Sequence, residues 1–372
     1  MKETRWFRWV ALALVSVTLA GSPVCAADKK KTTKPVVDIN RVWPPPPQKA
    51  HFKLLQIING EGDVVGKKKV SLLSRIVADE SAPSYIHFSR PYALAGDRHG
   101  KLYVTDTQLS SLFVIDPKDR SFKVFGADAD VQLKLPLAVT VDSDDRVWVA
   151  DGAMKSVLCY SSDEKLLLQF GSDPGTPAAP VPTLERPTGV ALDERRQRVY
   201  VSDAKLNKIF VFTTSGKFVK QLGKGGFEPG EFFFPGQLLV DSSGRLYVVD
   251  TQNARVQIFD PDFNVLKVIG KRGDGIGAFA RPKSIALDSQ GHLYVSDAWW
   301  HNIQIFGHDP RVKDPNELSV LLFIGEGGTR PGDFQGPAGI YIKSYDQVFV
   351  ADQMNSRIQV FQFLGGDEEQ KK

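Results

Sequence analysis

The stretch GRLYVVDTQNARVQIFD, residues 244–260, decides the fold of this chain. Apolar and polar residues alternate up to Asp250, give way to a short polar segment, and then alternate again, which predicts two β-strands joined by a tight loop. The same phrase occurs six times in the 372 residues, and each copy has an aspartate at the end of its first strand. These aspartates are Asp106, Asp151, Asp203, Asp250, Asp297 and Asp352.

A second repeated element precedes each copy of this phrase. It reads RPTGVALD, FPGQLLVD or RPKSIALD in three of the copies, and a proline stands near its start every time. Proline is tolerated at the first residue of a strand, where no ladder hydrogen bond needs its nitrogen. The marker prolines are Pro91, Pro136, Pro187, Pro235, Pro282 and Pro337. The repeated aspartates lie 45 to 55 residues apart, which is enough chain for a sheet of four short antiparallel strands.

Six such sheets arranged radially form an all-β fold, the six-bladed β-propeller of four-stranded antiparallel blades. The ring has to close, because a lone blade cannot bury both of its faces. The last repeat ends after its third strand, whereas one more strand pattern, HFKLLQIING, occupies residues 51–60. We therefore predict that residues 51–60 pair with residues 357–363, complete the last blade and close a propeller domain that spans residues 51–364.

The segment GKGGFEPGEFFFPGQLLVDSSGRLYVVDTQNARVQIFD resembles an NHL repeat, and so do the copies over residues 270–307 and 325–363. The resemblance covers residues 51–364, although the first two copies lack the glycine-rich lead-in. It implies a propeller without implying one activity. Similarity to bacterial extracytoplasmic NHL-repeat proteins implies an assembly or scaffold component, and it suggests an envelope redox complex or a multihaem cytochrome complex as the partner.

The first 26 residues have the pattern of a secretory signal peptide: a basic start, an apolar run, and small residues before a cleavage point after Ala26. We expect a periplasmic or extracellular protein with no transmembrane segment in the mature chain. Lipidation of Cys25 and an uncleaved anchor are the alternatives. Val24 does not suit a lipoprotein signal, and the apolar run is shorter than the ~20 residues that span a bilayer.

Two further segments lie outside the repeats. Residues 27–50 are rich in lysine and proline, and the run from Pro44 to Pro47 favours an extended linker; a docking peptide anchored by Trp43 is the alternative. Residues 365–372 are expected to form a disordered tail. The formal net charge of +4 is small, and basic residues of the repeats are interleaved with acidic ones, so we expect no binding to nucleic acid.

A binding site is expected on one face of the propeller. The loops between the second and third strands emerge there, together with the segments that lead into each first strand, and such loops commonly carry function. The repeated aspartates are expected to accept hydrogen bonds from their own loops. In the fourth and sixth copies they are also expected to pair with Arg255 and Arg357. These roles are structural.

The fifth copy differs, because Trp299, Trp300 and His301 occupy a loop that elsewhere holds small or polar residues. Exposed aromatic side chains are typical of binding sites. In the alternative interpretation, one tryptophan packs against a neighbouring blade and the other covers the channel mouth. The residues expected to contact a partner are Trp299, Trp300, His301, Asn302, Arg255, Met354 and Arg357.

We expect a non-catalytic module that binds a protein, with no catalytic residue assigned. The alternative is a metal-dependent lyase or a lactonase-like enzyme with its site at the channel mouth. A lyase zinc site would need three histidines, and only His87 and His301 are expected on the loop face. A channel-bound divalent ion such as calcium is left open, because turn chemistry already explains the asparagines Asn207, Asn253, Asn302 and Asn355. No other cofactor is expected.

Overall fold

The computed structural model describes residues 41–66, 85–126, 131–172, 175–176, 179–308, 318–343 and 346–365. The signal peptide expected over residues 1–26, residues 27–40 of the expected linker and residues 366–372 of the expected tail lie outside these ranges. In the part of the chain that is described, no helix is both long and apolar enough to cross a membrane.

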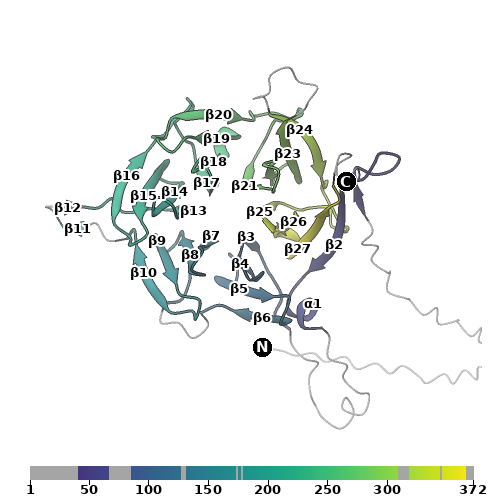
Figure 1. Cartoon of the computed structure of the whole chain (residues 1–372), viewed down its shortest axis with the longest axis horizontal. Coiled ribbons are helices and arrows are strands. Elements are labelled where there is room, and N and C mark those ends of the chain that lie inside the picture. The colour runs from purple at the N-terminus through teal and green to yellow at the C-terminus, as the bar shows by residue number, and fades with distance from the viewer. Residues whose placement is uncertain are drawn as a thin grey trace, which may run out of the picture. The chain divides into compact units, whose positions relative to one another are not determined.

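Six β-sheets stand around a common axis, with the first strand of each sheet nearest the centre (Figure 1). Blades one and two are β3 (Pro91–Gly96), β4 (Leu102–Asp106), β5 (Ser111–Asp116) and β6 (Ser121–Val124), then β7 (Pro136–Val141), β8 (Val147–Asp151), β9 (Ser156–Tyr160) and β10 (Leu166–Phe170). Blade three is β13 (Pro187–Asp193), β14 (Arg198–Asp203), β15 (Lys208–Thr213) and β16 (Phe218–Leu222).

Blades four and five continue the series. They are β17 (Pro235–Val240), β18 (Leu246–Asp250), β19 (Arg255–Phe259) and β20 (Val265–Ile269), then β21 (Pro282–Leu287), β22 (Leu293–Asp297), β23 (Asn302–His308) and β24 (Leu318–Ile324). Consecutive strands in every blade pair antiparallel, so the predicted six-bladed propeller is confirmed. Short elements between the blades are β11 (Gly175–Thr176), β12 (Ala179–Pro180) and α1 (Glu61–Val65). The 3₁₀ turns η1 (Thr251–Asn253) and η2 (Gln353–Asn355) join the second and third strands within blades four and six.

Blade six joins the two ends of the repeat region. Its inner strands are β25 (Pro337–Lys343), β26 (Gln347–Asp352) and β27 (Arg357–Phe363), and its fourth strand is β2 (Phe52–Ile58). Strand β2 pairs antiparallel with β27, from Phe52 opposite Phe363 to Ile58 opposite Ile358. The predicted closure by the N-terminal strand is therefore present, and it covers an edge of β27 that would otherwise expose unpaired backbone groups.

Blade six also has a fifth strand that the sequence did not predict. Strand β1 (Val42–Trp43) pairs with β2, although residues 27–50 were expected to form a linker. Trp43 is buried and meets Phe361 edge to face, with ring centroids 5.3 Å apart. Arg41 lies over the Trp43 ring and pairs with Asp333. Residues 41–43 therefore pack onto the propeller. Burial of Trp43 and the ion pair between Arg41 and Asp333 stabilise this strand, although the adjacent prolines favour an unpaired linker.

The hydrophobic core lies between the blades. One cluster combines Val249 and Ile258 of blade four with Ile285 and Val295 of blade five. Phenylalanines that precede the first strand of blades four, five and six seal these junctions, and all three are buried: Phe232, Phe279 and Phe334. Phe233 and Phe234, which follow Phe232 in the chain, are exposed.

Candidate protein-binding face

In four of the six blades, the repeated aspartate ties two loops together through backbone hydrogen bonds. In blade five, Asp297 accepts from the backbone N–H groups of Ala280 and Arg281 at 2.7 and 3.0 Å, and from those of Trp299 and Trp300 at 2.9 and 3.1 Å. Asp106, Asp151 and Asp203 bind the equivalent groups of their own blades. All four carboxylates are fully buried and accept several backbone hydrogen bonds, so they fix the conformation of the loops on this face.

Blades four and six use a larger side-chain network. Asp250 accepts from Phe233 N–H at 2.7 Å and, on its other oxygen, from Asn253 Nδ2 and Arg255 Nε, both at 2.8 Å, and from Gln257 Nε2 at 3.1 Å. Burial raises the pKa of Asp250 above that of an ordinary aspartate, although these donors act in the opposite direction. Blade six repeats the network around Asp352.

Arg255 and Arg357 were expected to contact a partner, but both are buried and use their donors inside the blade. Arg255 donates to the backbone oxygens of Phe227, Glu228 and Glu231 at 2.6, 2.9 and 2.9 Å. Arg357 makes the matching three bonds in blade six. Each arginine therefore clamps its lead-in loop to the blade, and neither is available to a partner. The sequence places them at the end of the loop, whereas the structure makes each the first residue of its third strand, with its side chain folded inward.

Blade five has lost this clamp. Trp300 and Asn302 occupy the positions of Asn253 and Arg255, counted from the repeated aspartate. Neither Asn302 Oδ1 nor Gln304 Oε1 has a hydrogen-bond partner, and both atoms are buried. Trp300 donates from Nε1 to the backbone oxygen of Gly273 at 3.1 Å, which makes one contact to the lead-in loop in place of the three from an arginine.

Exposed apolar side chains gather around this altered loop. The exposed fraction is 64% for Trp299, 37% for Trp300 and 59% for Met354. Two further residues that the sequence did not single out, Phe227 and Ile276, are 72% and 81% exposed. Each is a large apolar residue within a glycine-rich lead-in loop. This contrast in the sequence could have predicted that the two side chains are exposed. We call the set Phe227, Phe233, Ile276, Trp299, Trp300 and Met354 the tryptophan face.

Contacts connect the members of the tryptophan face across blades four and five. The rings of Phe227 and Phe233 lie 6.0 Å apart, and the backbone oxygen of Phe233 accepts from Gln252 N–H at 3.0 Å. The oxygen of Gln252 in turn accepts from the side chain of Arg272, which is followed in the chain by Gly273, the partner of Trp300. The loops that carry Phe227, Phe233, Trp299 and Trp300 are therefore joined to one another by hydrogen bonds.

The same face continues into blade six through His301. Its Nδ1 accepts from the backbone N–H of Gly336 at 3.0 Å, and Gly336 lies directly against Met354. His301 is thus half-buried at the junction and serves first to hold neighbouring loops together. Of the residues expected to contact a partner, Trp299, Trp300 and Met354 are exposed, His301 and Asn302 are half-buried, and the two arginines are withdrawn.

The central channel has a different character. The first strands of all six blades line a cavity of about 360 Å³, and its only acidic lining residue is Glu194. Within the described ranges, no group of three or more His, Cys, Asp or Glu side chains is arranged to hold a metal ion. The backbone of His87 forms an isolated β-bridge with Gly60, and the His301 ring accepts a hydrogen bond from Gly336 N–H. The two histidines expected on the loop face therefore make contacts at different places.

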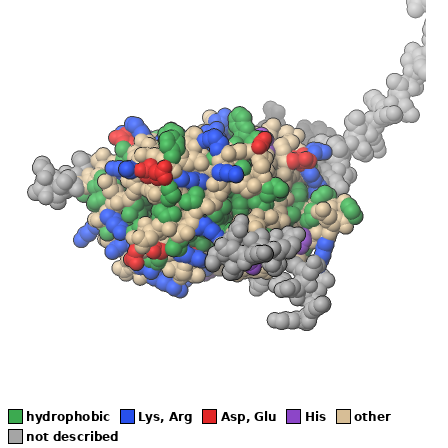
Figure 2. Space-filling model, turned by 90° about the horizontal axis from the view of Figure 1, so that it is seen from above, with side chains coloured by type: hydrophobic (Ala, Val, Ile, Leu, Met, Phe, Trp, Pro, Cys, Tyr) green, Lys and Arg blue, Asp and Glu red, His purple; other side chains and the backbone are tan. Residues whose placement is uncertain are grey.

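Charged side chains are mixed over the side of the ring shown in Figure 2. Basic and acidic residues alternate there, with apolar side chains between them, and no patch of one sign dominates the view.

Comparison with known proteins agrees with the propeller architecture. A family model described as "6-bladed beta-propeller" matches residues 191–245 and 237–309, which lie in blades three to five. A protein of unknown function from Bacteroides thetaiotaomicron superposes with a TM-score of 0.55 at 18% identity, over 76% of this chain and 71% of that one. Virginiamycin B lyase from Staphylococcus aureus superposes with a TM-score of 0.51 at 13% identity, over 84% of this chain and all of that one. At such identities the likeness shows the fold alone.

One curated relative is more similar in sequence over a shorter region. Peptidylglycine alpha-amidating monooxygenase of Rattus norvegicus is 33% identical over 139 residues, which is 35% of this chain. The matched region spans only 14% of the rat protein. Taken together, the blades and these similarities define the chain as a six-bladed β-propeller.

Proposed function

We propose that this chain is an extracytoplasmic NHL-repeat propeller that acts as a non-catalytic scaffold and binds a protein partner through the tryptophan face. The observation that carries the proposal is the exposure of Trp299, Trp300, Ile276 and Phe227 on loops of blades four and five. Large exposed apolar patches on soluble proteins mark interaction sites, and tryptophan is enriched among the residues that dominate binding energy.

Membership of the NHL-repeat group is supported by the Asp–Asn–Arg–Gln network of blades four and six. The network joins residues at fixed offsets from the repeated aspartate, so it gives a physical reason for the pattern that the sequence repeats. Export to the periplasm or the cell exterior is supported by the signal-like pattern of residues 1–26. Within that setting, an envelope redox complex or a multihaem cytochrome complex is the partner we propose from the NHL resemblance.

The alternative function is a metal-dependent lyase or lactonase-like activity at the channel mouth. Its support is the 33% identity to part of the rat amidating monooxygenase and the propeller fold shared with virginiamycin B lyase. The residues described here add no ligand cluster in its favour. Elemental analysis of the purified chain separates the two functions, because the alternative requires a stoichiometric divalent ion.

The test of the scaffold proposal is affinity capture from an envelope extract with the double variant Trp299→Ala/Trp300→Ala. Loss of two central aromatic anchors is expected to cost at least about 2 kcal/mol of binding free energy, which is about thirtyfold in affinity. The melting temperature should stay unchanged, because both rings contribute little to the core.

The matched control is Leu167→Ala/Leu266→Ala. These leucines are 55% and 54% exposed on the outer strands β10 and β20, away from the loop face. Capture should survive this change. If the tryptophan variant captures the same proteins in the same amounts as the leucine variant, the partner does not bind at the tryptophan face.

A further inference from the structure

The junction between blades six and one differs from its neighbours on the face opposite the tryptophan face. Elsewhere, carboxylates bridge adjacent blades there: Arg98 pairs with Asp145 at 3.0 Å, and Asp346 accepts from Ser289 N–H and Oγ at 3.1 and 2.8 Å. At the junction of blades six and one, Lys343 Nζ meets the backbone oxygen of Gly100 at 3.4 Å. This contact is long, so the closing junction is held loosely on this face.

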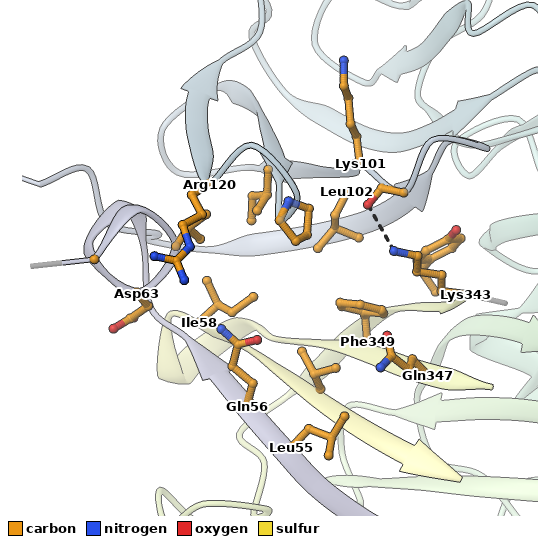
Figure 3. A pocket seen from close by; sticks show the side chains of 17 residues that line it. Leu55, Gln56, Ile58, Asp63, Lys101, Leu102, Arg120, Lys343, Gln347 and Phe349 are labelled. Carbon is orange, nitrogen blue, oxygen red and sulfur yellow. Dashed lines mark hydrogen bonds between the residues drawn. The ribbon is translucent and has the colours of Figure 1, made fainter. Parts of the chain in front are cut away.

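A cavity of about 460 Å³ opens at this junction, between β2, α1, blade one and blade six (Figure 3). We call it the seam pocket. Its floor is apolar and belongs to the core, with Ile58, Leu102, Ile115, Phe349 and Val360 all buried. A cavity of this volume, apolar inside and with a few polar groups at its rim, has the usual character of a small-molecule site.

The rim of the seam pocket carries mainly positive charge. Arg120 and Lys343 lie at opposite ends in Figure 3, whereas the side chain of Lys101, which also lines the cavity, points away from it. The one carboxylate of the rim, Asp63, already accepts from Asn59 N and Nδ2 at 2.7 and 3.0 Å. Among the described residues, neither Arg120 nor Lys343 forms an ion pair with a carboxylate. Among the described residues, the lining of the seam pocket therefore carries more positive than negative charge beside an apolar interior.

Lys343 is the cation best placed to hold an anion. Its side chain is half-buried at the end of β25, and its one hydrogen bond, to the oxygen of Gly100, is weak. A cation drawn partly out of water without a counter-charge costs free energy, which a bound anion would recover. We propose that the seam pocket binds an organic anion with an apolar body, whose charged group pairs with Lys343 while its apolar part covers Leu102 and Phe349. This site is separate from the tryptophan face and does not depend on the proposed function.

Dodecanoate is a suitable probe, with dodecan-1-ol and acetate as comparison ligands that lack the charge or the apolar body. Calorimetric titration of the full chain should give saturable binding of one dodecanoate. Dodecan-1-ol should bind about tenfold more weakly, because it forgoes a charge-assisted hydrogen bond, and acetate should not bind measurably. Equal affinity for dodecanoate and dodecan-1-ol, or the absence of saturable binding, would overturn the proposal.

Variants locate the site. Lys343→Gln should weaken dodecanoate binding about tenfold, and Lys343→Arg should retain it. Lys118→Gln is the matched control, since Lys118 lies exposed in the same turn as Arg120 but does not line the pocket. Gln56→Trp, a change at an exposed rim residue, should block the pocket without disturbing the core. Dodecanoate binding that persists unchanged in both Lys343→Gln and Gln56→Trp would place the ligand elsewhere and refute the site.

Discussion

Blades four and five have the same strands and the same repeated aspartate, yet their loops are held in different ways. In blade four, Arg255 bridges Asp250 and three carbonyl groups of the lead-in loop. In blade five, Asn302 stands at that position, and its Oδ1 has no partner. Backbone hydrogen bonds to Asp297 still shape the loop. Strand pairing and the aspartate are therefore sufficient for a blade, and the arginine clamp adds stability to it.

The difference explains where the exposed aromatic residues occur. A loop whose polar positions are used for internal hydrogen bonds has little freedom to change, as in blade four. In blade five the position of Asn253 is taken by Trp300, and Trp299 beside it is 64% exposed. The rigid sheet beneath allows this loop to vary, which is how propellers and other scaffolds acquire binding sites.

The largest loss of stability is expected from Arg255→Asn, which gives blade four the residue that blade five has at this position. The change leaves the buried carboxylate of Asp250 without its cation and removes the arginine donor from three carbonyl groups. Breaking a buried, hydrogen-bonded pair in this way costs about 3–5 kcal/mol. Urea unfolding should show the loss as a lower midpoint at an unchanged slope.

Arg245→Asn is the control for that experiment. Arg245 also pairs with an aspartate of blade four, Asp241, but it is half-exposed, and such pairs contribute about 1 kcal/mol or less. Equal losses for the two variants would mean that the clamp is no more important than a surface ion pair, and the comparison of the blades would fail.

A smaller effect, of opposite sign, is expected from Asn302→Arg. This change gives blade five the residue of blade four. It removes the unpaired Oδ1 of Asn302 and supplies donors for Asp297 and the carbonyl groups of the lead-in loop, as Arg255 does in blade four. Each unpaired buried acceptor carries a penalty, so we expect the free energy of unfolding to rise by about 1 kcal/mol. Asn302→Lys carries the charge without the planar fork and should give no such gain. A lower stability for Asn302→Arg than for Asn302→Lys would contradict the comparison.

The sequence predicted the scaffold well for a physical reason. The alternation of apolar and polar residues, the marker prolines and the repeated aspartates are local signals. Each of them occurs in all six repeats, so the six copies support the same prediction. The missing outer strand of blade six was also predictable, because residues 51–60 show the same alternation. Strand β1 could not be predicted, because it has only two residues and adjoins prolines that favour an extended linker.

The candidate site was less predictable. Trp299 and Trp300 stand out in the sequence by type, but the inward direction of Arg255 depends on carbonyl groups more than twenty residues upstream. The exposure of Ile276 depends on how the lead-in loop of blade five lies on its sheet. Such contacts between loops are set by the assembled blades and have no local signature.

The smallest expected effect on stability concerns the face opposite the tryptophan face. There, blade five pairs an aspartate with a histidine, whose charge changes near neutral pH, and blade four pairs it with an arginine, whose charge does not. His292 Nδ1 lies 2.8 Å from Asp288 Oδ2, and Arg245 makes the equivalent contact with Asp241. The hydrogen bond with Asp288 raises the pKa of His292, more than burial lowers it. The charged imidazole is thus favoured in the folded state. Its contribution to stability is complete below the unfolded-state pKa of about 6.5 and is lost as the pH rises through the higher folded-state pKa.

The variant His292→Arg should remove this dependence, because arginine keeps its charge over the whole range. We expect the wild-type chain to lose up to about 1 kcal/mol relative to His292→Arg between pH 6 and pH 9, measured as the difference between their free energies of unfolding at each pH. The same comparison for Arg245→Lys in blade four should be flat. Parallel curves for the wild type and His292→Arg would show that the imidazole has the same pKa folded and unfolded, and that blade five is no more sensitive to pH than blade four.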